Sequence, residues 1–344
     1  MADGLILPEE LRQAVAANAA TMTPIRFEWK EVKVHPSWRE DQLGKGPWIS
    51  TALANRTVLG NEKCYERRIF TEIDNVPCND GPDGESAFDG QFVYCGGNRK
   101  RNLSKFRAKN SLGRYFNFDY FSDAGFTLCD RAPVSFKSTL TEAIRSGSKV
   151  SAIEKLELKG RPCVCVHTAR ENSDRKRAEL EDTREVAGSL RGLGAAPDYI
   201  RWVVESIHCR RAMPAEIVQL FYLDVEYNYA LTQWEERIGD GEFLLEQISN
   251  EQFEQVGSRS IWLPRHCTWK RYLPTDAMTQ PRWRHEIWIN TIQPGVGDSQ
   301  FVLNYTAPGT FIEDRSQGDA MWEWKQYKIN SRRVAVQTKR GRCC

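Results

Sequence analysis

The sequence has no hydrophobic run of the length that a membrane-spanning helix needs, about 20 apolar residues. Its first residues, MADGLILPEELRQ, lack a basic segment followed by an apolar one, so no secretory signal peptide is visible. The net charge is only +2, which gives no general electrostatic case for binding nucleic acid. We therefore expect no transmembrane segment and no nucleic-acid partner. Either the protein is cytoplasmic, or a leader lies outside this chain.

Signatures of several common enzyme classes are also missing. The sequence has no G-x-S-x-G nucleophile elbow, no Walker phosphate loop and no G-x-G-x-x-G dinucleotide-binding turn. Its 10 cysteines are dispersed and form no C-x-x-C pair, which argues against a zinc ribbon or a thioredoxin-like redox site. We expect buried free thiols, with a disulfide or two as the alternative, and neither a cofactor nor a resident metal.

Aromatic residues, by contrast, are plentiful, with 11 Trp, 15 Phe and 11 Tyr. From about residue 217 to 271, apolar and polar residues alternate between turn signals, with little helical periodicity. This pattern predicts a long antiparallel meander with one apolar face. The same alternation in IRFEWKEVKV, residues 25–34, places Phe27 and Trp29 on one face of another strand.

The order of the expected elements indicates the fold class. Strands come first, helices are inserted over about 171–212, and strands follow, so the chain lacks βαβ alternation. We predict an α+β fold with a large curved antiparallel sheet, an incomplete β-barrel, and helices that cover its concave face. A single domain would span 1–331, and the basic segment 332–344 would be a disordered tail.

One group of residues could carry chemistry. Cys163, Cys165 and His167 alternate along one expected strand, so their side chains share a face. Thiolates and imidazole are zinc ligands. However, neighbours on one face of a strand lie about 7 Å apart, which strains a single tetrahedral site. Small buried cysteines are the simpler interpretation, and a metal-dependent or Cys/His hydrolase stays open as the alternative function.

The aromatic residues suggest a binding surface instead, because a curved sheet needs its concave face filled by side chains, a helix or a ligand. The residues that we expect to form the walls lie on strands: Phe27, Trp29, Phe221, Tyr229, Trp283 and Ile287. An apolar stripe on the helix at 197–211 is the expected lid: Ile200, Val203, Val204 and Ile207. Ordinary core packing is the competing interpretation for each of them.

Four phrases of the sequence carry a resemblance to a known family: GRPCVCVHT (160–168), FYLDVEYNYALTQWEER (221–237), SIWLPRHCTWKRY (260–272) and NYTAPGTFIEDR (304–315). They resemble segments of the bacterial lipoprotein-carrier superfamily that includes LolA, LolB and RseB. The resemblance covers roughly 150–315 and extends to 10–110. It implies an incomplete antiparallel β-barrel with helices at its mouth, a cavity for acyl chains or a hydrophobic peptide, and a location in the cell envelope.

The leading expectation is therefore a non-enzymatic protein that binds a lipid, a lipoprotein acyl chain or a hydrophobic peptide. A membrane-associated partner belongs with that expectation. Burial of an acyl chain would contribute about 0.8 kcal/mol per CH₂ group. A scaffold whose sheet edge or aromatic face binds a protein, without a small ligand, is a further alternative.

Overall fold

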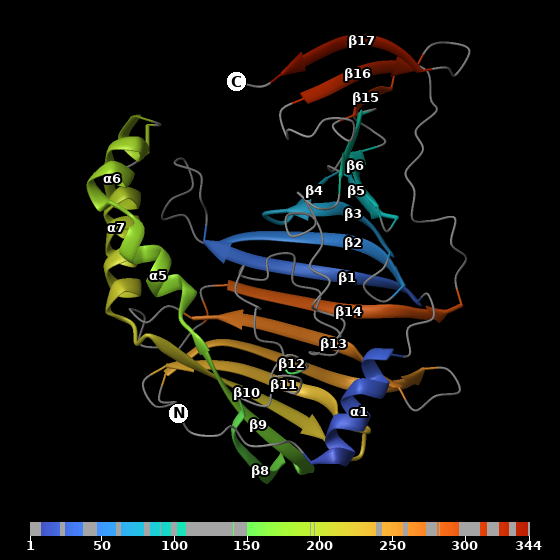
Figure 1. Cartoon of the computed structure of the whole chain (residues 1–344), viewed down its shortest axis with the longest axis vertical. Helices are drawn as coiled ribbons and strands as arrows, with labels where there is room; N and C mark the ends of the chain where they lie inside the picture. The colour runs from blue at the N-terminus through green and yellow to red at the C-terminus, as the bar shows by residue number, and fades with distance from the viewer. Residues whose placement is uncertain are drawn as a thin grey trace.

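The computed structural model shows a chain that is mostly β-strand (Figure 1). It describes residues 8–20, 25–36, 47–59, 63–78, 83–89, 91–97, 102–107, 140, 150–192, 194–195, 197–238, 243–256, 261–272, 281, 283–295, 310–314, 323–329 and 335–342. The described helices are α1 (Glu9–Ala20), α5 (Ser173–Leu180), α6 (Thr183–Gly192) and α7 (Pro197–Ala212). None of these helices is long and apolar enough to cross a membrane.

The strands follow one another along most of the described chain. They are β1 (Ile25–Pro36), β2 (Pro47–Leu59), β3 (Lys63–Ile73), β4 (Val76–Pro77), β5 (Asp83–Phe88), β6 (Phe92–Gly97), β7 (Asn102–Arg107), β8 (Val150–Leu158), β9 (Arg161–Glu171), β10 (Glu216–Asp224), β11 (Ala230–Ile238), β12 (Phe243–Val256), β13 (Ile261–Arg271), β14 (Trp283–Pro294), β15 (Phe311–Asp314), β16 (Glu323–Ile329) and β17 (Ala335–Arg342).

These strands join into one curved sheet (Figure 1). From edge to edge the order is β8-β9-β10-β11-β12-β13-β14-β1-β2-β3-β5-β6-β7-β15-β16-β17, with the short β4 beside β5 on β3. Neighbours are antiparallel, except that β7 and β15 are parallel. Within the described residues β8 and β17 do not pair, so the sheet is open. The predicted α+β class with a large, incomplete antiparallel sheet is confirmed.

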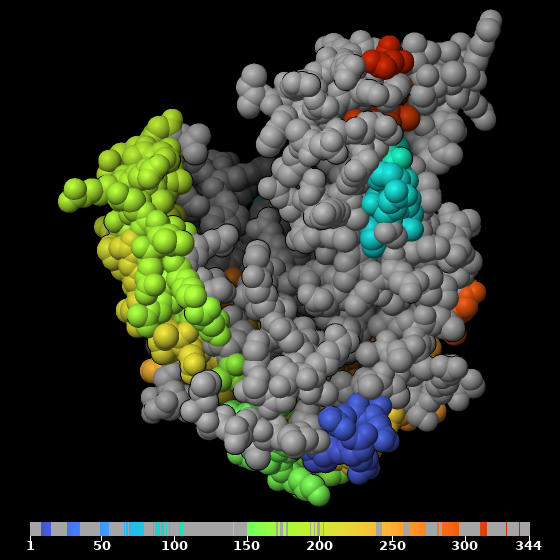
Figure 2. Space-filling model, in the orientation of Figure 1, coloured from blue at the N-terminus to red at the C-terminus, as the bar shows by residue number. Residues whose placement is uncertain are grey.

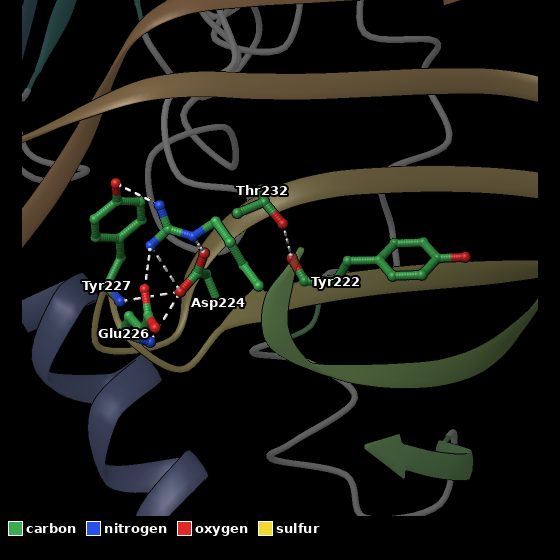
Figure 3. A network of polar contacts seen from close by, with 6 residues as sticks. Tyr222, Asp224, Glu226, Tyr227 and Thr232 are labelled. Atoms are coloured by element: carbon green, nitrogen blue, oxygen red, sulfur yellow. Dashed lines mark hydrogen bonds and ion pairs between the residues drawn. The ribbon is translucent and has the colours of Figure 1, made fainter. Parts of the chain in front are cut away.

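The turn between β10 and β11 shows how local sequence builds the meander (Figure 3). The buried Asp224 accepts hydrogen bonds from the backbone N–H groups of Glu226, at 2.8 Å, and Tyr227, at 3.2 Å. This is an Asx turn, which reverses the chain without a glycine. Arg161 at the start of β9 pairs with Asp224 at 2.7 Å, and its guanidinium lies 3.7 Å from the centre of the Tyr227 ring. The network therefore joins the β8–β9 hairpin to the next turn.

One face of the sheet is covered by α1, and we call it the inner face. Leu11 of α1 packs there in a core of buried residues: Leu140, Val150, Val164, Val166, Phe221, Leu223, Leu231, Trp234 and Ile248. Alternate residues of β9 to β12 supply most of this core, as expected for strands with one face packed. Among the described helices, α1 is the one that covers this part of the inner face.

Helices α5, α6 and α7 occupy the predicted insertion between β9 and β10. They pack against one another and stand beside the strand ends, at the left of Figures 1 and 2. Asn172 closes the base of this unit, because its side chain donates to the Pro214 carbonyl at 3.0 Å and accepts from the Arg175 N–H at 3.1 Å. Its own N–H donates to the Ala215 carbonyl at 2.8 Å. The start and the end of the insertion are thus held together.

Two parts of the chain differ from expectation. Segment 36–61 shows no regular pattern in the sequence, yet Pro47–Leu59 forms the central strand β2. The expected disordered tail contains β17, which pairs with β16 over Ala335–Arg342. The basic composition of this segment favours disorder, but pairing with β16 satisfies its backbone hydrogen bonds and orders it. Segment 108–137, for which the sequence predicts no regular element, lies outside the described residues.

Candidate functional site

Several of the expected wall residues lie together on the inner face. Phe27 and Trp29 of β1 and Ile287 of β14 are almost completely buried. Trp29 and His285 both contact Glu31, and His285 stands directly opposite Trp269, which packs against the α1 core. Because β1 and β14 are neighbours, these side chains continue the same surface as the core of β9 to β12.

The other wall residues from the meander belong to the α1 core itself. Phe221 is buried in that core, and the half-buried Tyr229 packs against it. Burial, together with the negative charge of Glu10 and a hydrogen bond to it, raises the pKa of Tyr229 above its ordinary value. Trp283 occupies a position in β14, and its side chain lies outside the described residues.

The expected lid residues lie on α7, away from the wall residues. Ile200 and Ile207 are buried, and Val203 and Val204 are half-buried. The helix packs against α5 and α6, and Figure 1 places it beyond the strand ends. The structure therefore brings together Phe27, Trp29, Phe221, Tyr229 and Ile287 of the expected site, and it places the helix residues at one end of the face.

A row of polar side chains crosses the inner face near the strand ends closest to α5–α7. Consecutive cross-strand partners from β9 to β13 form it: Thr168, Gln219, Glu236, Glu246 and Arg271. The Thr168 hydroxyl donates to Gln219 at 3.4 Å, and the Gln219 amide donates to Glu236 at 3.5 Å. Glu246 accepts from the Trp269 indole at 3.2 Å and pairs with Arg271 at 3.2 Å.

The row continues onto β14 and β1 as a second cluster around Glu31. This carboxylate is 1% exposed, accepts from the Trp29 indole at 3.1 Å and lies 3.2 Å from His285 Nε2. Lys33, two residues further along β1, lies 3.4 Å from the other carboxylate oxygen. Buried charges are costly unless they are paired and hydrogen-bonded, and Glu31 meets that condition. We call the two clusters together the polar belt.

Sequence reasoning missed the polar belt, although part of its signal was present. Glu31 and Lys33 continue the alternation of Phe27 and Trp29, so they had to share the apolar face. The acids Glu235 and Glu236 are neighbours on one strand, so they face opposite ways, and both are buried. The partners of these side chains on neighbouring strands can be identified only when the strand register is known, and the sequence does not give the register.

The thiols of β9 lie on the opposite, outer face. Cys163 and Cys165 are buried, and Cys165 stands opposite Tyr222 rather than in the α1 core. Burial and the nearby carboxylates of Glu154 and Glu235 raise the pKa of Cys165 to about 12, which disfavours a thiolate nucleophile. Within the described part of the chain, no group of three or more His, Cys, Asp or Glu side chains could hold a metal ion.

Comparison with known proteins finds similarity only among solved structures. No family model matches the chain, and no curated protein matches it. A LolA superfamily protein from Nitrosomonas europaea aligns over 87% of this chain and 98% of its own, with 9% identity and a TM-score of 0.41. A domain described as outer membrane lipoprotein-sorting, from Vibrio parahaemolyticus, aligns over 85% and 94%, with 10% identity and a TM-score of 0.40.

A third structure, LprF from Mycobacterium bovis, aligns over 84% of this chain and 99% of its own, with 8% identity and a TM-score of 0.24. The description of the Nitrosomonas europaea protein names the LolA superfamily, which the sequence phrases also resemble. At these identities and TM-scores the three likenesses carry no argument about this chain, so the function below is argued from its own side chains.

Proposed function

We propose that the inner face binds an apolar ligand without catalysing a reaction. The ligand would be a lipid, a lipoprotein acyl chain or a hydrophobic peptide. The supporting observation is continuity: buried apolar side chains extend over adjacent strands of one face, from Val166 of β9 through Phe221 and Trp234 to Ile287 and Trp29. Each buried CH₂ group of a ligand on such a surface would contribute about 0.8 kcal/mol.

These side chains are buried against other parts of the chain itself. Binding would therefore exchange contacts within the chain for contacts with the ligand, and the affinity would reflect the difference between the two. We expect moderate affinity, and a ligand with a long apolar chain should bind better than a short one. The helix α7 would act as a wall at one end of the face, with Ile207 packed inside the helical unit.

Mass spectrometry tests this proposal most directly. The full chain is purified gently and measured under native conditions, and then again after extraction with organic solvent. We expect an apolar species that leaves on denaturation. In parallel, binding of dodecanol is measured by the change in intrinsic tryptophan fluorescence. A bare polypeptide mass together with no dodecanol binding would contradict the proposal and favour a scaffold that binds a protein partner.

Two neighbouring residues on opposite faces of β14 provide matched variants. Ile287 is 2% exposed on the inner face, whereas Trp288 is 36% exposed on the outer face. Ile287→Ala removes apolar contact area, so dodecanol binding should weaken about tenfold, equivalent to about 1.4 kcal/mol. Trp288→Ala should leave it unchanged. Thermal unfolding of both variants shows whether each remains folded. Equal effects of the two variants on binding would place the ligand elsewhere.

A further inference from the structure

Two basic side chains on the inner face stand in front of buried carboxylates. Arg271 meets Glu246 through its Nε atom, and 32% of the arginine side chain is exposed against 4% of the glutamate. Lys33 forms a similar ion pair with Glu31 through its Nζ atom, and 19% of the lysine side chain is exposed against 1% of the glutamate. In both pairs the cation lies nearer the surface and the anion lies deeper.

The two carboxylates are held from several directions, which suits them to position the cations. Glu246 also accepts from the indole of Trp269, and Glu31 also contacts Trp29 and His285. A guanidinium that is fixed through Nε keeps a planar fork of donors in one orientation. Such a fork suits the oxygens of phosphate and carboxylate groups.

The spacing of the two cations allows them to act on one group. Arg271 and Lys33 lie on either side of β14, opposite Trp283 and His285 respectively. Two strand spacings and two residues along the strand put their Cα atoms about 12 Å apart, within joint reach of two long side chains. Glu236 lies opposite Glu246, so three buried carboxylates face these two cations, and an anion is held here only where both cations donate hydrogen bonds to it.

We propose that this part of the polar belt, Arg271 and Lys33, binds the anionic headgroup of an amphiphile. The headgroup would be a phosphate or a carboxylate, and the apolar chain would lie along Trp29 and Ile287 on the same face. The inference rests on the proposed function, because it adds a headgroup site to the apolar surface. It also orients the ligand, with its polar end toward the strand ends beside α5–α7.

A series of ligands with one chain length tests the headgroup. Dodecyl phosphate, dodecanol and dodecylamine are titrated into the full chain below their micelle concentrations, and binding is followed by tryptophan fluorescence. We expect dodecyl phosphate to bind at least about tenfold more tightly than dodecanol, as charge-assisted hydrogen bonds allow. Dodecylamine should bind no more tightly than dodecanol. Excess inorganic phosphate should compete poorly, because it lacks the apolar chain.

Variants on the two faces of the same strands provide the control. Arg271→Gln and Lys33→Gln should each reduce the preference for dodecyl phosphate over dodecanol to within about threefold. Arg271→Lys should retain most of it. Lys270→Gln and Lys30→Gln alter cations on the opposite face of β13 and β1, and should change nothing. If Arg271→Gln fails to fold, the double variant Glu246→Gln with Arg271→Gln removes the pair without leaving a buried charge alone.

Several results would overturn the inference. Equal binding of the three ligands, tighter binding of the amine, or an unchanged preference in the variants would each exclude a headgroup site at Arg271 and Lys33, while dodecanol binding would leave the proposed function standing. Full displacement of dodecyl phosphate by inorganic phosphate would indicate a simple anion site instead. Failure of all three ligands to bind would contradict both proposals together.

Discussion

Two charged clusters in the described part of the chain differ in what their carboxylates contact. The first surrounds Arg161 and Asp224 at the turn after β10, where the carboxylate accepts two backbone N–H groups (Figure 3). The second is the polar belt on the inner face, where Glu31 and Glu246 contact side chains of neighbouring strands. The turn cluster completes the backbone hydrogen bonding of a reversal. The belt lies in the regular part of the sheet, where the backbone is paired by the ladder.

This difference separates charge that completes a backbone turn from charge that lies in the regular part of the sheet. An Asx turn needs its carboxylate whatever the protein does, since the backbone N–H groups of the turn must have acceptors. A regular strand has no such requirement, and an apolar residue at the position of Glu31 could pack instead. Replacing a buried ion pair by apolar residues is often neutral or stabilising, so stability alone does not require the belt, and we propose that it serves binding.

The largest expected effect is at the turn. Asp224→Ala should destabilise the protein by about 3–5 kcal/mol, because it removes the acceptor of two backbone N–H groups and the buried carboxylate that pairs with Arg161. The matched control is Glu226→Ala: this carboxylate also contacts Arg161 but its side chain is 60% exposed, so the cost should be at most about 1 kcal/mol. Urea unfolding followed by far-UV circular dichroism measures both. Equal costs would mean that the Asx turn is unimportant.

A substitution in the polar belt should lower the free energy of unfolding by less than Asp224→Ala does. Glu31→Gln weakens contacts with Trp29, Lys33 and His285, and should destabilise the protein by about 1.5–3 kcal/mol, the range for hydrogen bonds to charged groups. Glu28→Gln alters the opposite face of β1, where Glu28 pairs with Arg26, and should cost at most about 1 kcal/mol. The same urea titration applies. A Glu31→Gln variant that is no less stable than the Glu28→Gln variant would contradict this expectation.

Much of the sheet could be predicted because apolar and polar residues alternate clearly along its strands. The alternation in β1 and in β10 to β14 follows from one apolar face, and it predicted these strands and the positions of Phe27, Trp29 and Ile287. β2 was missed because its pattern is reversed: the small residues Ala52 and Ala54 are buried, while Leu53 is 50% exposed. A short side chain facing inward gives little hydrophobic signal.

The polar belt could be predicted only in part. Continuing the alternation of β1 places Glu31 and Lys33 beside Trp29, and this step needs no structure. The partner His285 is remote in sequence, and Glu236 meets Glu246 only if β11 and β12 pair in one particular register. A shift by one residue would move either side chain to the other face. Register is fixed by the whole sheet, so the geometry of the site had to come from the structure.

The smallest expected effect concerns an exposed pair next to the turn cluster. Lys159 donates to Glu251 at 2.5 Å, with 59% and 44% of their side chains exposed. That hydrogen bond, with the charge of Lys159 and a contact to His266, lowers the pKa of Glu251. Because the folded-state pKa lies below the unfolded one, the pair stabilises the protein at neutral pH, and this stabilisation is lost as the pH falls through the lowered folded-state pKa. Lys159→Gln should therefore cost at most about 1 kcal/mol near pH 7, and progressively less as the pH falls below the ordinary range of a glutamate. A cost that persists at low pH would show that Lys159 acts through packing rather than charge.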